Sequence, residues 1–174
     1  LHYINKVLTS RTTETFEYHL SLPSGEQDFE ARCVASGATE VLVIVRNITK
    51  RKQAEMALEE SEANLRAIFD SSLQPFILID RDYRILIYNK TARKGLRLIL
   101  GKNIKERDLV HELIPAQYRA EFYEYFTRVL NAEPISVEKK INIGFANSWF
   151  QLNFDPVFAD NEVIAVCFSV RNVD

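Results

Sequence analysis

The chain has 174 residues, of which 47% are apolar and 26% charged, and these values are ordinary for a soluble globular protein of one large or two small domains. Its formal net charge of −2 predicts no general attraction to nucleic acid or to an anionic membrane surface. No apolar run approaches the ~18 residues that a membrane-spanning helix needs, and the start of the chain lacks the apolar core of a signal peptide.

The two cysteines, Cys33 and Cys167, do not have the spacing of a metal or redox site. Each lies in a strand-like segment, so we expect buried structural thiols and a cytoplasmic location, where thiols stay reduced. The chain does not begin with methionine, and we therefore expect it to be a piece of a longer protein.

Residues 1–49 are expected to hold the end of a helix followed by three antiparallel strands. Apolar and polar residues alternate over 16–22 and 29–33, while 41–45 is apolar on both faces, and turn residues separate the three segments. Three strands alone bury too little surface to be stable, so this part needs cover. We expect the open edge of the strand at 41–45 to pair with, or pack against, another chain.

Residues 50–72 are expected to form an amphipathic helix, with Thr49 as its cap. Small and apolar residues recur there at alternating steps of four and three, as in a coiled-coil seam of about two heptads. The seam residues are Ala54, Leu58, Ser61, Leu65 and Ile68. One interpretation is a helix packed on its own domain. The other is a parallel helix pair in a homodimer, kept weak by the small residues on the seam.

Residues 73–174 carry a complete series of elements. Two strands, at 76–80 and 84–88, flank a turn, and Asn89 is placed to cap a short helix. Pro115 then opens a longer helix, and three alternating strands follow Pro134. Both faces of the first two strands are apolar, so we expect the outer face to be covered by the preceding helix or by a partner protomer.

The chain also contains an internal repeat. Residues 45–49 (Val-Arg-Asn-Ile-Thr) return as 170–174 (Val-Arg-Asn-Val-Asp), and each copy closes a set of three strand-like segments. Only the second copy has a complete set of elements before it. The repeat predicts the tail of one domain, a connector, and a whole second domain of the same kind.

These segments resemble PAS domains, the sensor modules of bacterial two-component proteins. Residues 76–80 (Phe-Ile-Leu-Ile-Asp), 85–92 (Ile-Leu-Ile-Tyr-Asn-Lys-Thr-Ala) and 170–174 carry the resemblance, while 46–55 and 61–71 resemble the junction between tandem PAS domains. In both closing motifs an Asn stands where the family usually has Asp, and Asn still caps and hydrogen-bonds locally.

The resemblance implies an α+β fold. Its five-stranded antiparallel sheet would have the spatial order second, first, fifth, fourth, third (2-1-5-4-3), with helices over one face and a pocket between. Residues 1–49 then match the C-terminal part of a first PAS domain, with three of its strands. Residues 50–72 match a linker helix, and residues 73–174 a complete PAS domain.

Ten apolar residues are expected to line the pocket. On the first strand either Ile77 and Ile79 or Phe76 and Leu78 face inward, and resemblance to flavin-binding relatives favours Ile77 and Ile79. The expected lining is Ile77, Ile79, Phe122, Phe126, Phe150, Leu152, Phe154, Val166, Phe168 and Val170. One interpretation is that these side chains fill a closed core, and the other is that they surround a small hydrophobic ligand.

The resemblance argues against the family's coloured cofactors. Flavin-binding relatives place amides at positions matching Phe150 and Val170, which are apolar here, and their reactive Cys motif is missing. Haem-binding relatives use a His on the long helix, and residues 115–130 contain none. We expect neither flavin, haem nor metal.

No catalytic constellation stands out, so the chain is not expected to be an enzyme. His111 and Glu112, with Pro115 shortly after, are similar to the phosphoacceptor box of histidine kinases, but the Pro comes one residue early. We interpret His111 as a surface or capping residue.

The resemblance implies a sensory module of a signalling protein, with a histidine kinase as the expected parent. The signal would pass through the linker helix and a dimer interface to a downstream kinase or other effector domain. Two alternatives remain: a ligand-free dimerisation and relay module, and the sensor region of a diguanylate cyclase. The sequence does not name the signal.

Overall fold

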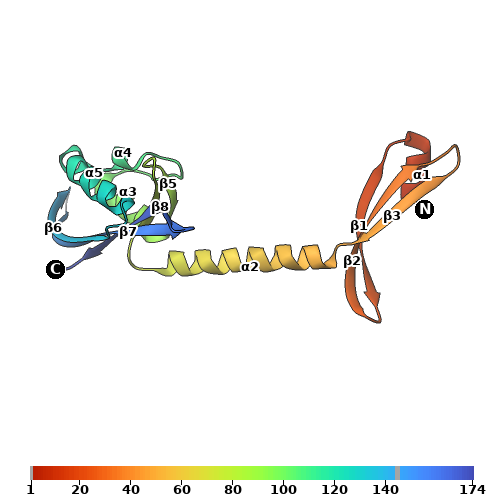
Figure 1. Ribbon diagram of the computed structural model, residues 1–174, viewed down its shortest axis with the longest axis horizontal. Helices are drawn as coiled ribbons and strands as arrows, with labels where there is room; N and C mark the ends of the chain where they lie inside the picture. Colours follow the sequence, from red (N-terminus) through yellow and green to blue (C-terminus); the bar gives the residue numbers. More distant parts are fainter. Residues whose placement is uncertain (1, 144–145) are drawn as a thin grey trace. The chain divides into compact units, whose positions relative to one another are not determined.

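The computed structural model describes residues 2–143 and 146–174 (Figure 1). The chain divides into two compact units, Leu1–Leu65 and Arg66–Asp174, which we call the first and the second unit. In the described part of the chain, no helix is both long enough and apolar enough to cross a membrane.

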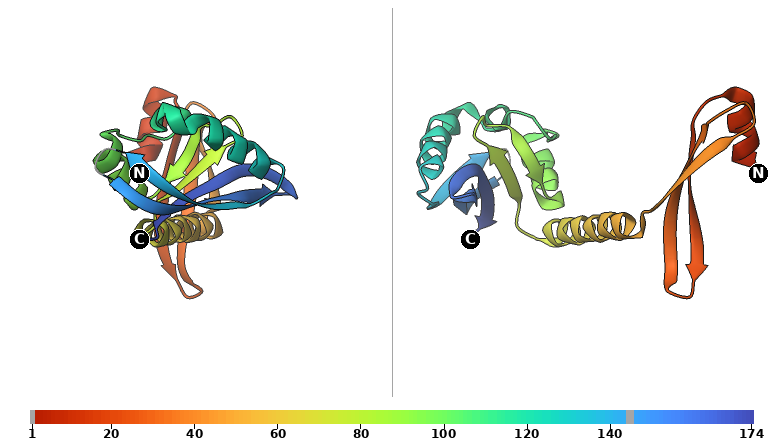
Figure 2. Two further views of the ribbon diagram at one scale, coloured as in Figure 1. Left: turned by 90° about the vertical axis from the view of Figure 1, so that its left-hand side faces the viewer. Right: turned by 45° about the vertical axis from the view of Figure 1, so that its right-hand side comes forward.

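The first unit begins with α1 (His2–Ser10), followed by three antiparallel strands in the order β1-β2-β3. The strands are β1 (Glu14–Leu22), β2 (Gly25–Ala35) and β3 (Val41–Asn47), each longer than the alternation predicted. The β1–β2 hairpin extends beyond β3, because Gly25 to Asp28 pair with β1 alone (Figure 2). Its turn needs glycine, since Gly25 has a φ of 109°.

A small core holds α1 on the sheet of the first unit. Val7 of α1 is fully buried, as are Ala31 and Cys33 of β2. Tyr3 stacks on Phe16 with a ring-centroid distance of 4.0 Å. The α1 helix therefore covers part of one face of a sheet that would otherwise be too small to bury an apolar face.

Strand β3 keeps large apolar side chains in contact with solvent on both faces. Leu42 and Ile44 are 54% and 53% exposed, and Val43 and Val45 on the other face are 42% and 52% exposed. One edge of β3 pairs with β2, and the other edge pairs with no strand in the described part of the chain. In this single chain β3 is thus the open edge that the sequence predicted.

Helix α2 (Thr49–Ser71) is fastened to the first unit at its N-terminal turn. Lys52 Nζ lies 2.7 Å from Glu17 Oε2 and 3.3 Å from Asp28 Oδ1. The expectation that Thr49 caps this helix was wrong. Its hydroxyl instead accepts a hydrogen bond from the Asp28 backbone N–H, at 2.9 Å, and its own N–H donates to Asn47 Oδ1, at 3.0 Å.

The second unit holds a five-stranded antiparallel sheet in the order β5-β4-β8-β7-β6, which in chain order is second, first, fifth, fourth, third. The strands are β4 (Phe76–Asp80), β5 (Ile85–Tyr88), β6 (Ile135–Ile143), β7 (Ala146–Ala159) and β8 (Glu162–Asn172). The helices α3 (Lys90–Leu100), α4 (Val110–Leu113) and α5 (Ala116–Leu130) lie over one face of this sheet (Figures 1 and 2).

The ends of these helices follow from local sequence. Asn89 caps α3 by accepting a hydrogen bond from the Ala92 N–H at 2.9 Å, and Gly101 ends it with a φ of 64°, a left-handed conformation that favours glycine. Pro115 stands at the N-cap position of α5. Both helix starts confirm the sequence predictions.

The core of the second unit lies between the sheet and these helices. Ile77 and Ile79 are buried and face it, while Phe76 and Leu78 are half-buried on the outer face of β4, which confirms the predicted choice between the two pairs. Phe126, with no exposed surface, packs on Tyr83 at a centroid distance of 4.6 Å. This end of the core is therefore closely packed.

The two cysteines differ in burial. Cys33 is buried, as predicted, but Cys167 is only half-buried, because it lies on the outer face of β8 between the inward-facing Val166 and Phe168. Partial burial, with a smaller contribution from the negative charge of Asp155, raises the pKa of the Cys167 thiol. A raised pKa keeps this thiol protonated and weakly nucleophilic at neutral pH.

Candidate functional site

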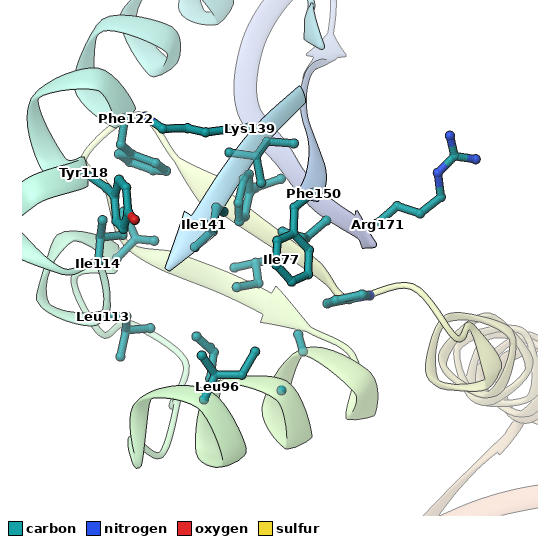
Figure 3. Close-up of a pocket in the computed structure, with 18 of the residues that line it drawn as sticks. Ile77, Leu96, Leu113, Ile114, Tyr118, Phe122, Lys139, Ile141, Phe150 and Arg171 are labelled. Carbon is teal, nitrogen blue, oxygen red and sulfur yellow. The ribbon is translucent and has the colours of Figure 1, made fainter. Parts of the chain in front are cut away.

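A cavity of about 660 Å³ lies between the inner face of the five-stranded sheet and helices α3, α4 and α5 (Figure 3). Ile77 of β4 and Phe150 of β7 form part of the sheet side, and Leu96 of α3 and Leu113 of α4 form part of the helix side (Figure 3). The wall is overwhelmingly apolar, so the cavity offers an ordinary site for a small apolar molecule.

Most of the predicted lining residues lie in the cavity wall. They are Ile77, Phe122, Phe150, Leu152, Phe154, Phe168 and Val170. The five on β7 and β8 follow the period of two, which places alternate side chains on the inner face of the sheet.

The other three predicted lining residues, Ile79, Phe126 and Val166, do not line the cavity. All three are fully buried in the core beside it. Ile79 pairs with Val166 in the β4–β8 register, and Phe126 lies one helical turn after Phe122 on α5. The three therefore occupy the closed end of the space between sheet and helices, which alternation within a strand cannot distinguish from the open end.

The sequence prediction missed the parts of the cavity wall that α3 and α4 form. Ala92 and Leu96 on α3, and Leu113 and Ile114 at the end of α4, contribute to the wall. The spacing of Ala92 and Leu96 by four was a usable signal, since these positions share one helix face. The short α4 helix offers no comparable period.

The wall also contains polar residues, which are Gln74, Tyr118, Glu121, Lys139, Arg171 and Asn172. Three of them form a group. Lys139 of β6 pairs with the carboxylate of Glu121 on α5, and its Nζ lies 5.1 Å from the centre of the Tyr118 ring. Tyr125 donates a hydrogen bond to the same carboxylate at 2.7 Å. Hydrogen bonds from Gln117 and from the Asn142 backbone N–H lower the pKa of Tyr118, with a smaller contribution from the Lys139 charge.

A buried hydrogen-bonded centre links the cavity region to the end of α2. Asn89 has no exposed surface, and its amide nitrogen donates to the backbone oxygens of Phe69 and Gln74, at 3.3 and 2.8 Å. Its Oδ1 accepts from Phe76 N as well as from Ala92 N. Gln74 is also one of the residues that line the cavity, and its side-chain amide donates to Ser169 Oγ at 2.9 Å. One residue thus contacts both the cavity wall and the Asn89 centre.

The part of the chain that matches a known protein family is nearly the same as the second unit. The family model described as "PAS fold" matches residues 69–174, which is more than half of the chain. The chain belongs to the PAS family. The matched PAS domain contains the whole five-stranded sheet, the three helices over it and the cavity.

Similar proteins include a kinase and several solved structures. Sporulation kinase E of Bacillus subtilis is 38% identical over 69 residues, which cover 40% of this chain and only 9% of the kinase. The crystal structure of the phage VqmA–DPO complex matches with a TM-score of 0.51 and 16% identity, covering 66% of this chain and 54% of that one. The crystal structure of a sensory box sensor histidine kinase from Vibrio cholerae is also 16% identical and has a TM-score of 0.46. That match covers 69% of this chain and 95% of that one. The structural likeness shows the fold alone.

The predicted seam residues that precede the PAS domain are all exposed. Leu58, Leu65 and Ile68 of α2 are 60%, 65% and 69% exposed, and Ala54 and Ser61 are exposed as well. No residue of α2 is buried. Within the second unit, the Phe69 ring at the end of α2 lies 6.1 Å from that of Phe76, which is on the outer face of β4.

Other chemistry is sparse in the PAS domain. Among residues 2–143 and 146–174, no group of three or more His, Cys, Asp or Glu side chains is arranged to hold a metal ion. His111 lies within α4 and not at a cap position, and it is partly exposed beside Tyr123, at a ring-centroid distance of 6.2 Å. Its Nδ1 has no hydrogen-bond partner among the described residues.

Proposed function

We propose that residues 66–174 act as a sensory PAS domain that binds a small apolar molecule in the cavity. The observation that carries this proposal is the cavity itself. Its volume of about 660 Å³ lies within the range of ~300–1,000 Å³ that is common for small-molecule sites, and its wall combines many apolar residues with a few polar ones. A ligand-free module would not need to keep this space open, because protein interiors normally close-pack.

The contacts of Gln74 and Asn89 support a route from the cavity to α2. Gln74 lines the cavity, and its backbone oxygen binds the same Asn89 amide that binds Phe69 O in the last turns of α2. A ligand that moves Gln74 would change the hydrogen bonds that hold the end of α2. The helix would then pass this change to neighbouring domains, as in switches that couple a local contact to a larger element.

We further propose that this PAS domain works in a histidine kinase or a similar signalling protein. The similarity to sporulation kinase E supports this, although the chain spans only 9% of the length of that kinase. The effector would then lie in other parts of the parent protein, in the cytoplasm. The PAS domain itself would supply no catalysis.

Residues 1–49 are proposed to be the C-terminal part of a preceding PAS domain. The strand registers support this, because the pairs Ala31↔Val45 and Cys33↔Val43 of β2–β3 have counterparts in β7–β8. Those counterparts are Leu152↔Val170 and Phe154↔Phe168.

Two local features of the backbone support the same repeat. Asn47 Oδ1 accepts a hydrogen bond from Thr49 N at 3.0 Å, and Asn172 Oδ1 accepts one from Asp174 N at 2.9 Å. Arg11 lies between α1 and β1, and Ala132 lies between α5 and β6, the strand that β1 matches in this correspondence. Both residues have a positive φ angle, of 58° and 65°. By this correspondence the open edge of β3 matches the edge of β8 that pairs with β4, so we propose that a strand of another chain pairs there.

The cavity can be filled without removing any contact, by replacing Gly95 with phenylalanine. Gly95 lies within α3 in the cavity wall, and a Cβ added there would meet no atom within 4 Å. The Gly95→Phe ring would occupy ligand space, so we expect binding of the neutral fluorophore 1-aminoanthracene to weaken at least tenfold. The midpoint temperature of thermal unfolding should not fall, because the original glycine destabilises a helix by roughly 0.5–1 kcal/mol relative to alanine.

Gly95→Ala is the matched control for this experiment. It removes the same helical glycine but adds a single methyl group. It should therefore raise the thermal stability, and it should lower the affinity for the fluorophore by no more than a few fold. The proposal is contradicted if the unmodified chain does not bind the fluorophore, or if Gly95→Phe binds it as tightly as the unmodified chain.

The exposed seam of α2 supports a second function, dimerisation and relay. Leu58 and Leu65 occupy the same position in successive heptads and are 60% and 65% exposed, which is an unfavourable state for leucines on one helix face. We propose that a second copy of the chain covers this seam in a parallel helix pair. Such a homodimer is compatible with ligand binding and would also serve a ligand-free relay.

Lysine at both Leu58 and Leu65 is expected to prevent dimerisation. Like charges would face each other across the pair and the apolar contacts would be lost. Light scattering coupled to size-exclusion chromatography should give twice the 20.1 kDa of one chain for the unmodified protein and a single-chain mass for the variant. Met56→Lys is the control, because Met56 is equally exposed but lies off the seam. A monomeric unmodified chain would refute the helix pair.

A further inference from the structure

The polar group in the cavity wall consists of Lys139, Glu121 and Tyr118. Lys139 and Glu121 form an ion pair, and their side chains remain 29% and 35% exposed. The Lys139 Nζ also lies 5.1 Å from the centre of the Tyr118 ring. Figure 3 shows Lys139 and Tyr118 across the cavity from Leu96. The group is therefore within reach of a molecule that fills the apolar part of the cavity.

This group has more hydrogen-bond donors than its neighbours use. An ammonium has three N–H donors, and Lys139 gives one to Glu121 and none to another acceptor among the described residues. The Tyr118 oxygen accepts a hydrogen bond from Asn142 N, at 3.3 Å. Its own O–H proton has no acceptor in the part of the chain that the structure describes. These donors are free to bind an acceptor atom of a ligand that reaches the group.

The charge of the group indicates what kind of acceptor this is. Lys139 already neutralises Glu121, so a ligand carboxylate would place a second negative charge beside the Glu121 carboxylate. Repulsion between like charges within a few ångströms is costly in a partly desolvated site. A carbonyl or hydroxyl oxygen accepts the same hydrogen bonds without this repulsion.

We propose that the cavity binds an uncharged, mostly apolar molecule that carries one carbonyl or hydroxyl oxygen, and that Lys139 and Tyr118 donate hydrogen bonds to this oxygen. The inference rests on the proposed function, since it assigns the ligand class of the same cavity. It distinguishes this ligand from hydrocarbons, which offer no acceptor, and from fatty or aromatic acids, which carry a charge.

Three naphthalenes of nearly equal shape test the proposal: 2-acetylnaphthalene, 2-isopropylnaphthalene and 2-naphthoate. Their affinities for the 174-residue chain are measured by displacement of 1-aminoanthracene. Lys139→Met should lower the affinity for the acetyl compound about tenfold, which is the usual effect of losing a hydrogen bond to a charged donor. It should lower the affinity for the isopropyl compound less than twofold. Tyr118→Phe should act in the same selective way, by a smaller factor. Lys140→Met, an exposed neighbour outside the cavity wall, should change neither affinity.

Glu121→Gln tests the charge argument. It leaves the Lys139 charge unbalanced, so it should raise the affinity for 2-naphthoate severalfold and change the affinity for the acetyl compound less. The inference is overturned if all three compounds bind but Lys139→Met and Tyr118→Phe affect the acetyl and isopropyl compounds equally in folded protein, as judged by circular dichroism. It is also overturned if 2-naphthoate binds to the unmodified chain more tightly than the acetyl compound. If no compound binds the unmodified chain, the proposed function itself fails.

Discussion

Replacement of Phe126 with alanine is expected to lower the free energy of unfolding of the second unit by about 3–5 kcal/mol. Phe126 has no exposed surface and packs on the rings of Tyr83 and Phe122, at centroid distances of 4.6 and 5.7 Å. Truncation would remove these contacts and leave a void at the closed end of the core. A loss of this size is a large part of the stability of an ordinary domain.

Urea unfolding followed by tryptophan fluorescence measures this loss in the second unit, because Trp149 on β7 is the sole tryptophan of the chain. Phe158→Ala is the control, since Phe158 is 53% exposed and its truncation should change the unfolding free energy by less than about 0.5 kcal/mol. Equal effects of the two substitutions would mean that Phe126 does not lie in a packed core.

Asn89→Ala is expected to destabilise the same unit by about 3–4 kcal/mol, even though it removes only a small polar side chain. The substitution removes the α3 cap and leaves two backbone N–H groups, of Phe76 and Ala92, without their acceptor. It also leaves the backbone oxygens of Phe69 and Gln74 without their donor. Because Asn89 is fully buried, water does not readily replace these partners.

The loss at Asn89 is measured by the same unfolding experiment. Asn131→Ala serves as the control, because the Asn131 amide makes one exposed hydrogen bond, to Thr127 O. Hydrogen exchange at the end of α2 adds a second readout, and the amides of the last helical turn should exchange faster in Asn89→Ala. An Asn89→Ala chain as stable as the unmodified one would remove the proposed link between α2 and the cavity.

Much of the fold follows from patterns that are visible in the sequence. Period-two alternation located five of the strands, and apolar runs beside turn residues located β3, β4 and β5. Asn89 and Pro115 located two helix starts. These signals are all local. The cap expected at Thr49 failed for a non-local reason: its hydroxyl binds the backbone of Asp28, a residue that β2 brings beside the start of α2. No pattern within the α2 segment reports on that contact.

The candidate site was only half accessible to sequence reasoning. Strand alternation placed Phe150, Leu152 and Phe168 on the inner face, where the structure has them. It could not tell that Ile79 and Val166 lie at the closed end of the core, because depth depends on how closely α5 approaches the sheet. Lys139 shares its face of β6 with Val137, but a lysine between apolar positions was not recognised as a cavity residue.

The central claim, that the cavity of the second unit is a ligand site, is tested most directly by an NMR titration. The ¹⁵N-labelled 174-residue chain is titrated with 2-acetylnaphthalene, and the backbone amide shifts are followed residue by residue. We predict saturable shifts concentrated at Leu96, Tyr118, Lys139 and Phe150, with smaller ones at Gln74, while amides of residues 2–49 stay in place. Shifts that are absent, or that gather on the exposed apolar residues of β3 or α2 instead, would contradict the account.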